Sequence, residues 1–422
     1  MSEKQRRYWG DIMQIVQKSS PHLRRPKASV VRMMRDVAIA LSPLVIFAIV
    51  QHGLTAVGIL LAAVVSMVLT EYVYYQVQDF KARKFNNTEF HVKLAALKKE
   101  KENNQKTLSK DDFKTYLEDY KAKTSVLKQQ LNDYAKTRPT EENLSFRLKN
   151  KSFTLYNFTV IVSGLIYGLT IPDATPIMVV IIGGVVGVFL AKLIFGGMGQ
   201  NIFNIAAFAR VFIALSFGAA VAVNNFVDAT AGATALGVLV LEPFANVTET
   251  YSYGMLFTGI GLPGGLGETS ALFILVGFGY LLYRKSFDVF IPIVYVGTVF
   301  VLSLAVMITQ ELGFYYPMQH VLAGGLMFGA VYMATDPITS PATRPGRLYF
   351  AFGLGVLTFV IRLFGNYPEG VAFSLLIMNM FVPSFDYPKW SNSRFTKRGV
   401  LIFIAVILVT IISVIVGANY VG

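Results

Sequence analysis

The sequence predicts an all-α polytopic membrane protein with about 10–11 transmembrane helices, broken or re-entrant segments and a cytoplasmic helical hairpin. Of its 422 residues, 54% are hydrophobic and 15% are charged, whereas soluble domains carry about 25% charged residues. The apolar residues gather in runs long enough to cross a bilayer. Of the 38 Lys and Arg residues, nine lie in residues 1–36 and eighteen in residues 79–151. This distribution excludes a soluble enzyme and leaves no basic face for nucleic acid.

The N-terminal third has three predicted parts. A basic cytoplasmic segment covers residues 1–36, a first transmembrane helix pair covers residues 37–78, and a charged cytoplasmic insertion covers residues 79–151. Within the insertion, Ser109 followed by Asp112 is typical of a helix start, and apolar residues recur at helical spacing around this point. We therefore expect a helical hairpin, which is either a docking arm for a partner or a solvated spacer.

The main transmembrane domain covers residues 152–422. With the helix pair, it gives eleven apolar runs, at residues 37–52, 54–75, 154–170, 176–194, 206–224, 268–283, 289–308, 321–334, 348–364, 370–383 and 400–417. Three stretches place Gly or Pro beside polar residues: 195–204 (FGGMGQNIFN), 259–270 (GIGLPGGLGETS) and 334–345 (ATDPITSPATRP). Non-helical backbone at membrane depth is tolerated only against protein or a polar cavity. These stretches therefore predict broken segments around a buried ligand site, as in carriers built from paired repeats.

The charged residues predict the orientation, because Lys and Arg collect in cytoplasmic loops. With a cytoplasmic N-terminus, the insertion and the basic connecting loops all fall on the cytoplasmic side. The opposite loops contain acidic residues without Lys or Arg: Asp173, Asp228, Glu242, Glu249, Glu311 and Glu369. We expect a multi-pass cell-membrane protein in contact with lipid, with the loop at residues 225–252 outside the cytoplasm.

Three ionisable residues lie in or beside the predicted spans, where a charge rarely persists without a use. Glu268 is either a ligand contact or a carboxylate favoured by a helix N-terminus. Asp336 is either a ligand contact or a turn-forming residue before a proline. Arg362 either binds an anion such as a phosphate or extends to the membrane interface. The chain has no Cys and only four His, so we expect no metal site, and it carries no soluble-enzyme motif to mark a catalytic residue.

The predicted outer loop contains the pattern Asp-x-x-x-Gly-Ala-Thr, formed by Asp228, Gly232, Ala233 and Thr234. This pattern resembles the target of flavin transferases, which attach FMN through its phosphate to a threonine hydroxyl. Small neighbours let the transferring enzyme approach the backbone, and the acid can position or activate the reacting group.

The chain as a whole resembles the D subunit of the Rnf electron-transport complex and, more distantly, the B subunit of the sodium-pumping NADH:quinone reductase. The resemblance covers nearly everything except residues 79–151 and about the last forty. It rests on SPHLRRPK (20–27), GGMGQNIFN (196–204), the Thr234 segment, GETSAL (267–272), AGGLMFGAVYMATDP (323–337), residues 346–362 and GNYPEGVAFSLLIMNMFVP (365–383).

The resemblance implies a membrane subunit that passes electrons in a complex that moves Na⁺ or H⁺. It implies covalent FMN on Thr234, a second, non-covalent flavin such as riboflavin in some members, other membrane and flavoprotein subunits as partners, and a flavin transferase for maturation. Arg362 is then expected near the flavin or its phosphate, and Glu268 and Asp336 become candidate ion or flavin contacts.

The chain departs from the family pattern at three places. Asn204, Ile205 and Ala206 stand where the family usually has Asn-Pro-Ala, Ala231 stands where Ser or Thr is common, and the helical insertion is atypical.

Two further functions are compatible with the residues alone. Broken helices also suit a small-solute or ion transporter without a redox group, and the hairpin would suit a membrane scaffold.

Overall fold

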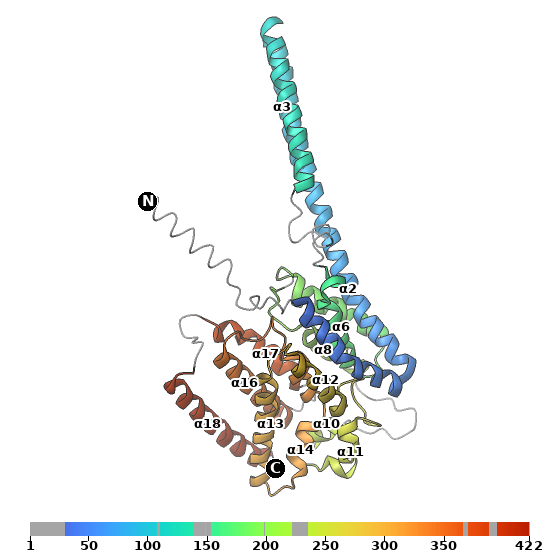
Figure 1. The fold of residues 1–422 in the computed structure, drawn as a ribbon, viewed down its shortest axis with the longest axis vertical. Coiled ribbons are helices and arrows are strands. Elements are labelled where there is room, and N and C mark those ends of the chain that lie inside the picture. Colours follow the sequence, from blue (N-terminus) through green and yellow to red (C-terminus); the bar gives the residue numbers. More distant parts are fainter. Residues whose placement is uncertain are drawn as a thin grey trace. The chain divides into compact units, whose positions relative to one another are not determined.

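The computed structural model describes residues 30–107, 110–137, 148, 153–197, 199–221, 235–365, 370–387 and 395–421. These residues are helical with short connections (Figure 1), which confirms the all-α class. Their one strand-like feature is an isolated bridge between Pro172 and Gly265. The chain divides into two compact units, called here the membrane unit (residues 1–68 and 157–422) and the hairpin unit (Leu69–Tyr156).

The first two predicted spans belong to α2 (Val30–Thr107), which is broken by a kink at Gly53. Gly53 has φ 61° and ψ −139°, a conformation that glycine adopts readily and other residues avoid. The predicted gap between the runs at residues 37–52 and 54–75 therefore coincides with the break in the helix.

The first half of the remaining membrane unit contains short helices. They are α5 (Thr154–Asn157), α6 (Thr159–Leu169), α7 (Ile177–Val188), the π-helix η1 (Phe189–Leu193), α8 (Ile205–Ser216), α9 (Gly218–Val221), α10 (Ala235–Leu241), the 3₁₀-helix η2 (Val247–Glu249) and α11 (Tyr253–Thr258). The predicted run at residues 206–224 is interrupted at Phe217, where α8 ends.

The second half contains longer helices and a second interruption. They are α12 (Ala271–Arg284), α13 (Phe290–Thr309), α14 (Tyr315–Leu322), α15 (Leu326–Phe328), the π-helix η3 (Gly329–Met333), α16 (Arg344–Phe364), α17 (Gly370–Phe385) and α18 (Lys397–Val421). The predicted run at residues 321–334 is thus a broken segment, because α14 stops before two glycines and the chain resumes as α15 and η3.

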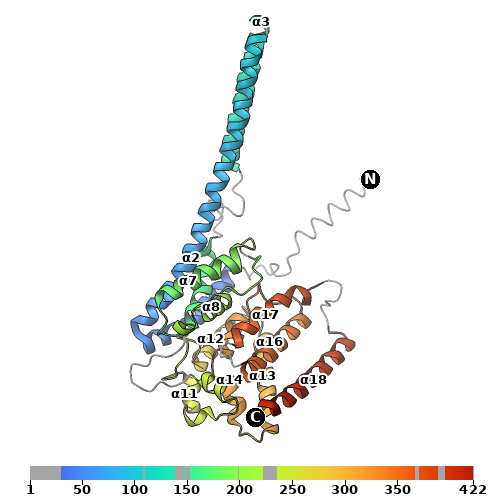
Figure 2. The same cartoon turned by 180° about the vertical axis from the view of Figure 1, so that it is seen from behind.

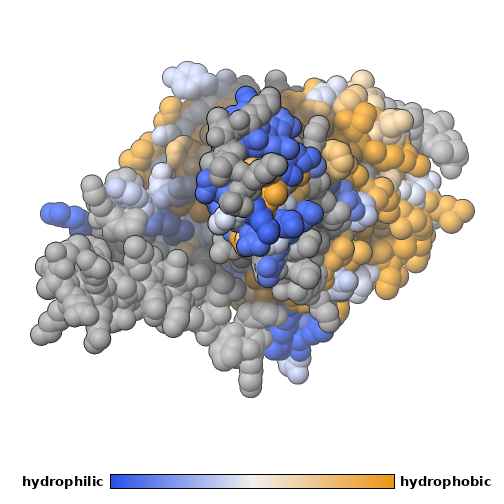
Figure 3. Space-filling view, turned by 90° about the horizontal axis from the view of Figure 1, so that it is seen from above, coloured by the Kyte–Doolittle hydropathy of each residue, from blue (hydrophilic) through white to orange (hydrophobic). Residues whose placement is uncertain are grey.

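Length and hydropathy agree with a protein that spans the membrane several times. Among the described residues, four helices are long and apolar enough to cross a bilayer, and five more apolar helices are shorter. Hydrophobic side chains cover much of the flank of the membrane unit (Figure 3). α18 is the most exposed of the four long helices, because only 6% of its most apolar 18-residue stretch is buried. Most of its surface therefore faces outward.

Glycines let the helices of the membrane unit approach closely. Gly183 of α7 lies against the hydroxyl of Tyr167, and that hydroxyl donates a hydrogen bond to Val180 O. Gly277 of α12 lies in the same way against the hydroxyl of Tyr332, which donates to Ala40 O. At both glycines a Cβ atom would overlap the tyrosine.

The hairpin unit confirms the helical prediction for the insertion. The distal part of α2 runs beside α3 (Lys110–Thr137), as both views of the ribbon show (Figures 1 and 2). Lys101 Nζ lies 5.2 Å from the centre of the Tyr120 ring, which joins the two helices. Ser109, the predicted helix cap, lies outside the described residues.

Candidate functional site

Two broken segments of the membrane unit have the same local architecture. The first follows η1 and ends where Asn204 Oδ1 accepts a hydrogen bond from Ala207 N–H at 3.1 Å, which caps α8. The second follows η3 and ends where Thr343 Oγ1 accepts one from Gly346 N–H at 3.2 Å, which caps α16. π-Helices are uncommon and occur frequently at functional sites, so a π-helix before each break marks both segments.

Side-chain amides join these two segments. Asn204 N–H donates to Asn379 Oδ1 at 3.0 Å, and Asn204 Nδ2 donates to Met333 O at 3.2 Å. Asn379 Nδ2 in turn donates to Thr339 O at 2.9 Å. Asn204 and Asn379 are 5% and 1% exposed. They satisfy backbone groups that the broken helices leave free, as buried backbone requires.

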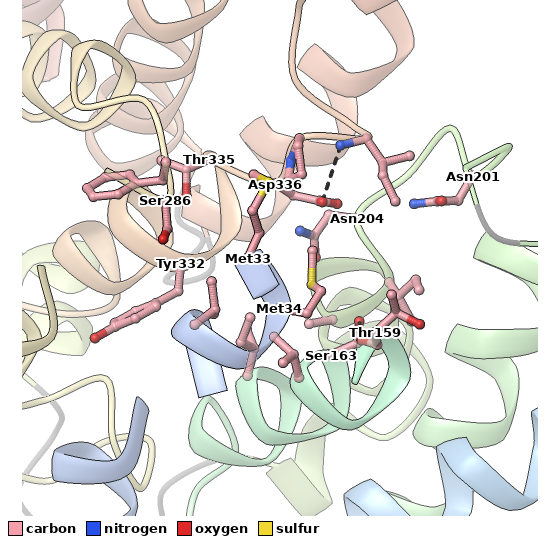
Figure 4. Close-up of a pocket in the computed structure, with 18 of the residues that line it drawn as sticks. Met33, Met34, Thr159, Ser163, Asn201, Asn204, Ser286, Tyr332, Thr335 and Asp336 are labelled. Carbon is pink, nitrogen blue, oxygen red and sulfur yellow. Dashed lines mark hydrogen bonds between the residues drawn. The ribbon is translucent and has the colours of Figure 1, made fainter. Parts of the chain in front are cut away.

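A cavity of about 60 Å³ lies where the two segments meet (Figure 4). The apolar wall comes mainly from α2, α6 and η3 and includes Met33, Met34, Ile166 and Tyr332. Polar groups lie among these side chains, contributed by Thr159, Ser163, Lys192, Asn201, Asn204, Thr335 and Asp336. Such a lining suits an amphipathic organic ligand, because ligand sites are mostly apolar with a few placed polar groups.

Asp336, predicted from the sequence, lies on this cavity. Its carboxylate accepts hydrogen bonds from Ile338 N–H at 3.3 Å and from Thr339 Oγ1 at 3.1 Å. These bonds are those of a turn-forming aspartate, so the residue shapes the turn and lines the cavity. Lys192 of η1 lies on the same cavity and is only 2% exposed. The cavity therefore contains both an acidic and a basic side chain.

Arg362, the second predicted ionisable residue, is buried in α16 with 2% of its surface exposed. Its Nη1 donates to His320 O at 2.7 Å and its Nη2 donates to Ala323 O at 3.3 Å. Nε makes no hydrogen bond among the described residues. The guanidinium thus holds the C-terminal end of α14 inside the protein and does not extend to the membrane interface.

Glu268, the third, lies in the turn that precedes α12. Ser270 caps that helix, so Glu268 lies outside its first turn and is not the helix-terminal carboxylate that we considered. The Glu268 carboxylate packs closely against Gly325, where a side chain would leave no room: a Cβ atom built on Gly325 would lie 2.7 Å from Glu268 Oε2. Glu268 is also close enough to Arg362 for their charges to interact. The structure thus brings Glu268 and Arg362 together at the α14–α15 break and places Asp336 at the cavity.

The flavin-attachment motif itself, Asp228, Gly232, Ala233 and Thr234, lies outside the described residues. Its nearest described neighbour is α10, whose first residue, Ala235, follows Thr234 in the chain. Leu236 of α10 and the Arg362 guanidinium both pack against Gly324. A Cβ atom built on this glycine would lie 3.0 Å from Leu236 Cδ2 and 3.4 Å from Arg362 Nη2. The chain two residues after Thr234 is therefore close to the Arg362 guanidinium.

Comparison with known proteins identifies the family of this chain. The sequence model of the NQR2, RnfD, RnfE family matches residues 16–97 and 140–393, which include both broken segments and the α14–α15 break. The chain belongs to this family. The NQR2, RnfD, RnfE family thus accounts for most of the membrane unit, and residues 98–139 of the hairpin unit and the last helix, α18, lie outside the match.

Three relatives within the family show the range of similarity. The D subunit of a proton-translocating ferredoxin:NAD⁺ oxidoreductase complex from Clostridium ljungdahlii is 38% identical over 57% of this chain and 75% of its own length. The D subunit of a Na⁺-translocating ferredoxin:NAD⁺ oxidoreductase complex from Acetobacterium woodii is 34% identical over 60% and 75%. The B subunit of a Na⁺-translocating NADH–quinone reductase from Chromohalobacter salexigens is 35% identical over 54% and 57%.

The departure from the family pattern at Ile205 leaves the start of α8 regular. Proline, which the resemblance led us to expect here, is favoured at the first position of a helix because its fixed φ suits that position. Here Ile205 occupies the first position, and the Asn204 side chain supplies the cap. The helix therefore starts correctly without the proline.

Sequence reasoning missed two polar residues of these sites, Lys192 and Asn379. Each lies inside or beside an apolar run, where a single polar residue gives no pattern of its own. A π-helix is also not visible in hydrophobic periodicity.

Among the described residues, no group of three or more His, Asp or Glu side chains could hold a metal ion.

Proposed function

We propose that this chain, a membrane subunit of an Rnf- or Nqr-type ion-translocating redox complex, carries FMN covalently on Thr234 and passes electrons through it. The single observation that carries the proposal is the position of α10. This helix follows Thr234 directly, and its second residue packs beside Gly324 and the Arg362 guanidinium.

The described residues fit a phosphate-linked group on Thr234. Arg362 supplies a buried cation, and its Nε has no hydrogen-bond partner among the described residues. A buried positive charge near the start of α10 favours the negatively charged phosphate of a phosphoester on the preceding residue. Glu268 offsets part of that charge, so the field at Thr234 depends on the pair.

The chain's own residues then have two tasks. The bound flavin supplies the redox chemistry, as cofactors generally do. α10 and the residues packed against it fix the position of the attachment threonine, and the Arg362–Glu268 pair sets the local charge. We place the Thr234 loop outside the cytoplasm, because the loops on its predicted side contain acidic residues without Lys or Arg.

We further propose that the cavity between the broken segments binds the second flavin, a non-covalent one such as riboflavin. Because the cavity itself has only about 60 Å³, binding requires the side chains that line it to move outward. Its apolar wall of Met33, Met34 and Tyr332 suits a planar ring, and its amide, hydroxyl and charged groups suit the ring's polar edge and the ribityl chain. A flavin here would contact Asp336 and Lys192.

Flavin content of the purified protein tests both proposals. The chain is co-expressed with a flavin transferase, separated on a denaturing gel and viewed under ultraviolet light. The parent protein should give a fluorescent band that Thr234→Ala abolishes, and Thr234→Ser should retain the band because it keeps the hydroxyl. A dark parent band, or a fluorescent Thr234→Ala band, would contradict covalent attachment at this residue.

The supernatant after acid precipitation reports the second flavin separately. We expect Thr234→Ala to release as much free flavin as the parent does. Asp336→Asn, which removes the negative charge from the cavity and keeps an oxygen acceptor for the turn, should reduce the released flavin and leave the fluorescent band intact. Equal release from Asp336→Asn and from the parent would move the non-covalent flavin away from this cavity.

The complex as a whole requires further subunits, and we propose that a partner flavoprotein supplies the electrons. The two ferredoxin-linked relatives are named for different ions, one for protons and one for Na⁺. Electron-driven Na⁺ uptake into vesicles that contain the complete complex, measured with and without a protonophore, identifies the ion that moves.

A further inference from the structure

The side chain of Gln319 holds the backbone of a distant loop. Its Oε1 accepts a hydrogen bond from Val247 N–H at 3.1 Å, and its Nε2 donates one to Ala245 O at 3.0 Å. Gln319 is 0% exposed. A single buried amide therefore fixes both a donor and an acceptor of residues 245–247, the loop that connects α10 to η2.

Gln319 belongs to α14, and Arg362 fixes the C-terminal end of that helix. The guanidinium binds the carbonyl oxygens of His320 and Ala323. α14 is thus held to α16 by Arg362 and holds the 245–247 loop through Gln319. α10, α11 and α14 lie at the same end of the membrane unit (Figure 1), and α14 contacts both α11 and η2.

An apolar cluster continues this connection to the residues that follow Thr234. Its members come from α10, from the segment that Gln319 holds, from α11 and the turn after it, and from the α14–α15 break: Ala235, Leu236, Leu239, Val247, Tyr251, Leu256, Leu262 and Ala323. α10 therefore shares one apolar cluster with Val247, whose N–H Gln319 holds, and α10 contacts η2, which begins at Val247.

We propose that Gln319 is a positioning residue for the flavin on Thr234, which it orders through the 245–247 loop and α10. This inference rests on the proposed attachment of FMN to Thr234. Gln319 does not touch the flavin in this arrangement. It keeps the first turn of α10 in one position, so that the attachment threonine is presented to the flavin transferase and the attached flavin is held in a fixed environment.

The chemistry of an amide explains why glutamine serves here. The loop offers one N–H and one C=O, and a primary amide supplies one acceptor and one donor to match them. Leucine has a similar volume and supplies neither, so both backbone groups would be left unsatisfied in a buried site. An ionised glutamate can only accept, whereas a protonated glutamate again has a donor and an acceptor.

The test compares Gln319→Leu and Gln319→Glu with the parent, all in the full-length protein with a flavin transferase. We measure covalent flavin per polypeptide by mass spectrometry and the order of the attached flavin by its fluorescence anisotropy. We expect at least about a fivefold loss of covalent flavin or a clear fall in anisotropy for Gln319→Leu, since unsatisfied buried groups change such populations by this factor or more.

Gln319→Glu separates positioning from a general loss of folding. Anisotropy in this variant should rise toward the parent value as the pH falls through the pKa of the introduced carboxyl, which burial raises, because protonation restores the donor. The parent should show no such rise. A merely destabilised protein would lose order at acidic pH.

Gln310→Leu is the matched control, because it makes the same substitution at the C-terminal end of α13, where Gln310 Nε2 donates to Asn419 Oδ1 at 2.7 Å. This variant should keep parent levels of flavin and anisotropy. Parent-like attachment and anisotropy in Gln319→Leu would refute the positioning role while leaving attachment to Thr234 intact. Failure of the parent itself to carry flavin would instead refute the proposed function.

Discussion

Buried charges of the membrane unit are held by specific neighbours. Asp36 is fully buried and accepts hydrogen bonds from Arg284 Nη2 at 3.2 Å and from Ser286 Oγ. Arg362 donates to two backbone carbonyl oxygens instead of to a carboxylate. Each contact lowers the cost of removing a charge from water, which is large for an unpartnered ion. Ionisable residues of the membrane unit therefore act first as connections between segments.

Asp173 provides a pH-dependent case outside the spans. His52 Nδ1 lies 3.0 Å from Asp173 Oδ2, which joins the kink of α2 to the loop before α7. The hydrogen bond to His52 lowers the pKa of Asp173. A carboxylate with a lowered pKa adds stability above its unfolded pKa, about 3.9, and this contribution is lost as the pH falls through the folded value.

We therefore expect Asp173→Asn to lower the thermal unfolding midpoint of the detergent-solubilised protein between about pH 5 and 7. The deficit should shrink as the pH falls below about 4, because the parent then loses the same charge. The effect should be small, since Asp173 is partly exposed and surface pairs contribute about 0–1 kcal/mol. A deficit that grows at acidic pH would contradict the assignment of the stabilising charge to Asp173.

Breaks and close contacts between helices decide the arrangement of the elements. η1 and η3 each lead into a non-helical segment that ends at a side-chain cap, and Asn204 and Asn379 join the two segments. The cavity with Lys192 and Asp336 exists because the helices stop there. A pair of unbroken helices would fill this space with their own backbone and expose no polar groups to a ligand.

Two glycines of α12 test how far close packing between helices depends on the absence of a side chain. Gly277→Ala would place a Cβ atom against Tyr332 Oη and Ala40 O, whereas Gly279→Ala meets no atom within 4 Å. Overpacking costs about 1–3 kcal/mol, occasionally more, and alanine in an open helical position is favoured over glycine by about 1 kcal/mol.

Gly277→Ala should therefore lower the thermal unfolding midpoint and the yield of monodisperse protein, and Gly279→Ala should leave both unchanged or slightly raised. Size-exclusion chromatography and thermal unfolding in detergent provide the readout. Equal behaviour of the two variants would show that Gly277 does not limit the approach of α12 to η3 and α2.

The molecule combines a family core with chain-specific additions. The NQR2, RnfD, RnfE match covers the parts of the membrane unit that form the cavity and the α14–α15 break, and it omits residues 98–139 and α18. The hairpin unit is a separate compact part. The electron-transfer apparatus that we propose therefore lies within the residues that the family model matches.

Single-cysteine labelling tests the proposed orientation of the whole chain, because the natural sequence contains no cysteine. Thr250 is exposed in the predicted outer loop, and Lys397 is exposed at the start of α18, in a predicted cytoplasmic segment. We expect Thr250→Cys to react with a membrane-impermeant maleimide in intact cells and Lys397→Cys to react only after permeabilisation. The reverse pattern would overturn the orientation and place the Thr234 loop in the cytoplasm.

The sequence by itself determined the class of the protein, the approximate position of most apolar helices, the broken stretches and the family. Hydrophobic length, charge distribution and Gly- or Pro-containing stretches are local properties, and each can be seen in consecutive residues. Gly53 shows this well, since one residue between two apolar runs marked the kink.

Only the tertiary structure decided which breaks meet and what the buried polar residues bind. Asn204 and Asn379 are 175 positions apart in the chain, and Gln319 reaches a loop 72 positions away. Such partners cannot be assigned from one sequence, because hydrogen bonds between distant segments depend on how helices pack and leave no periodic pattern. For the same reason Arg362, which the sequence marked as a cation near the outer side, proved to be a buried connection between α16 and the end of α14.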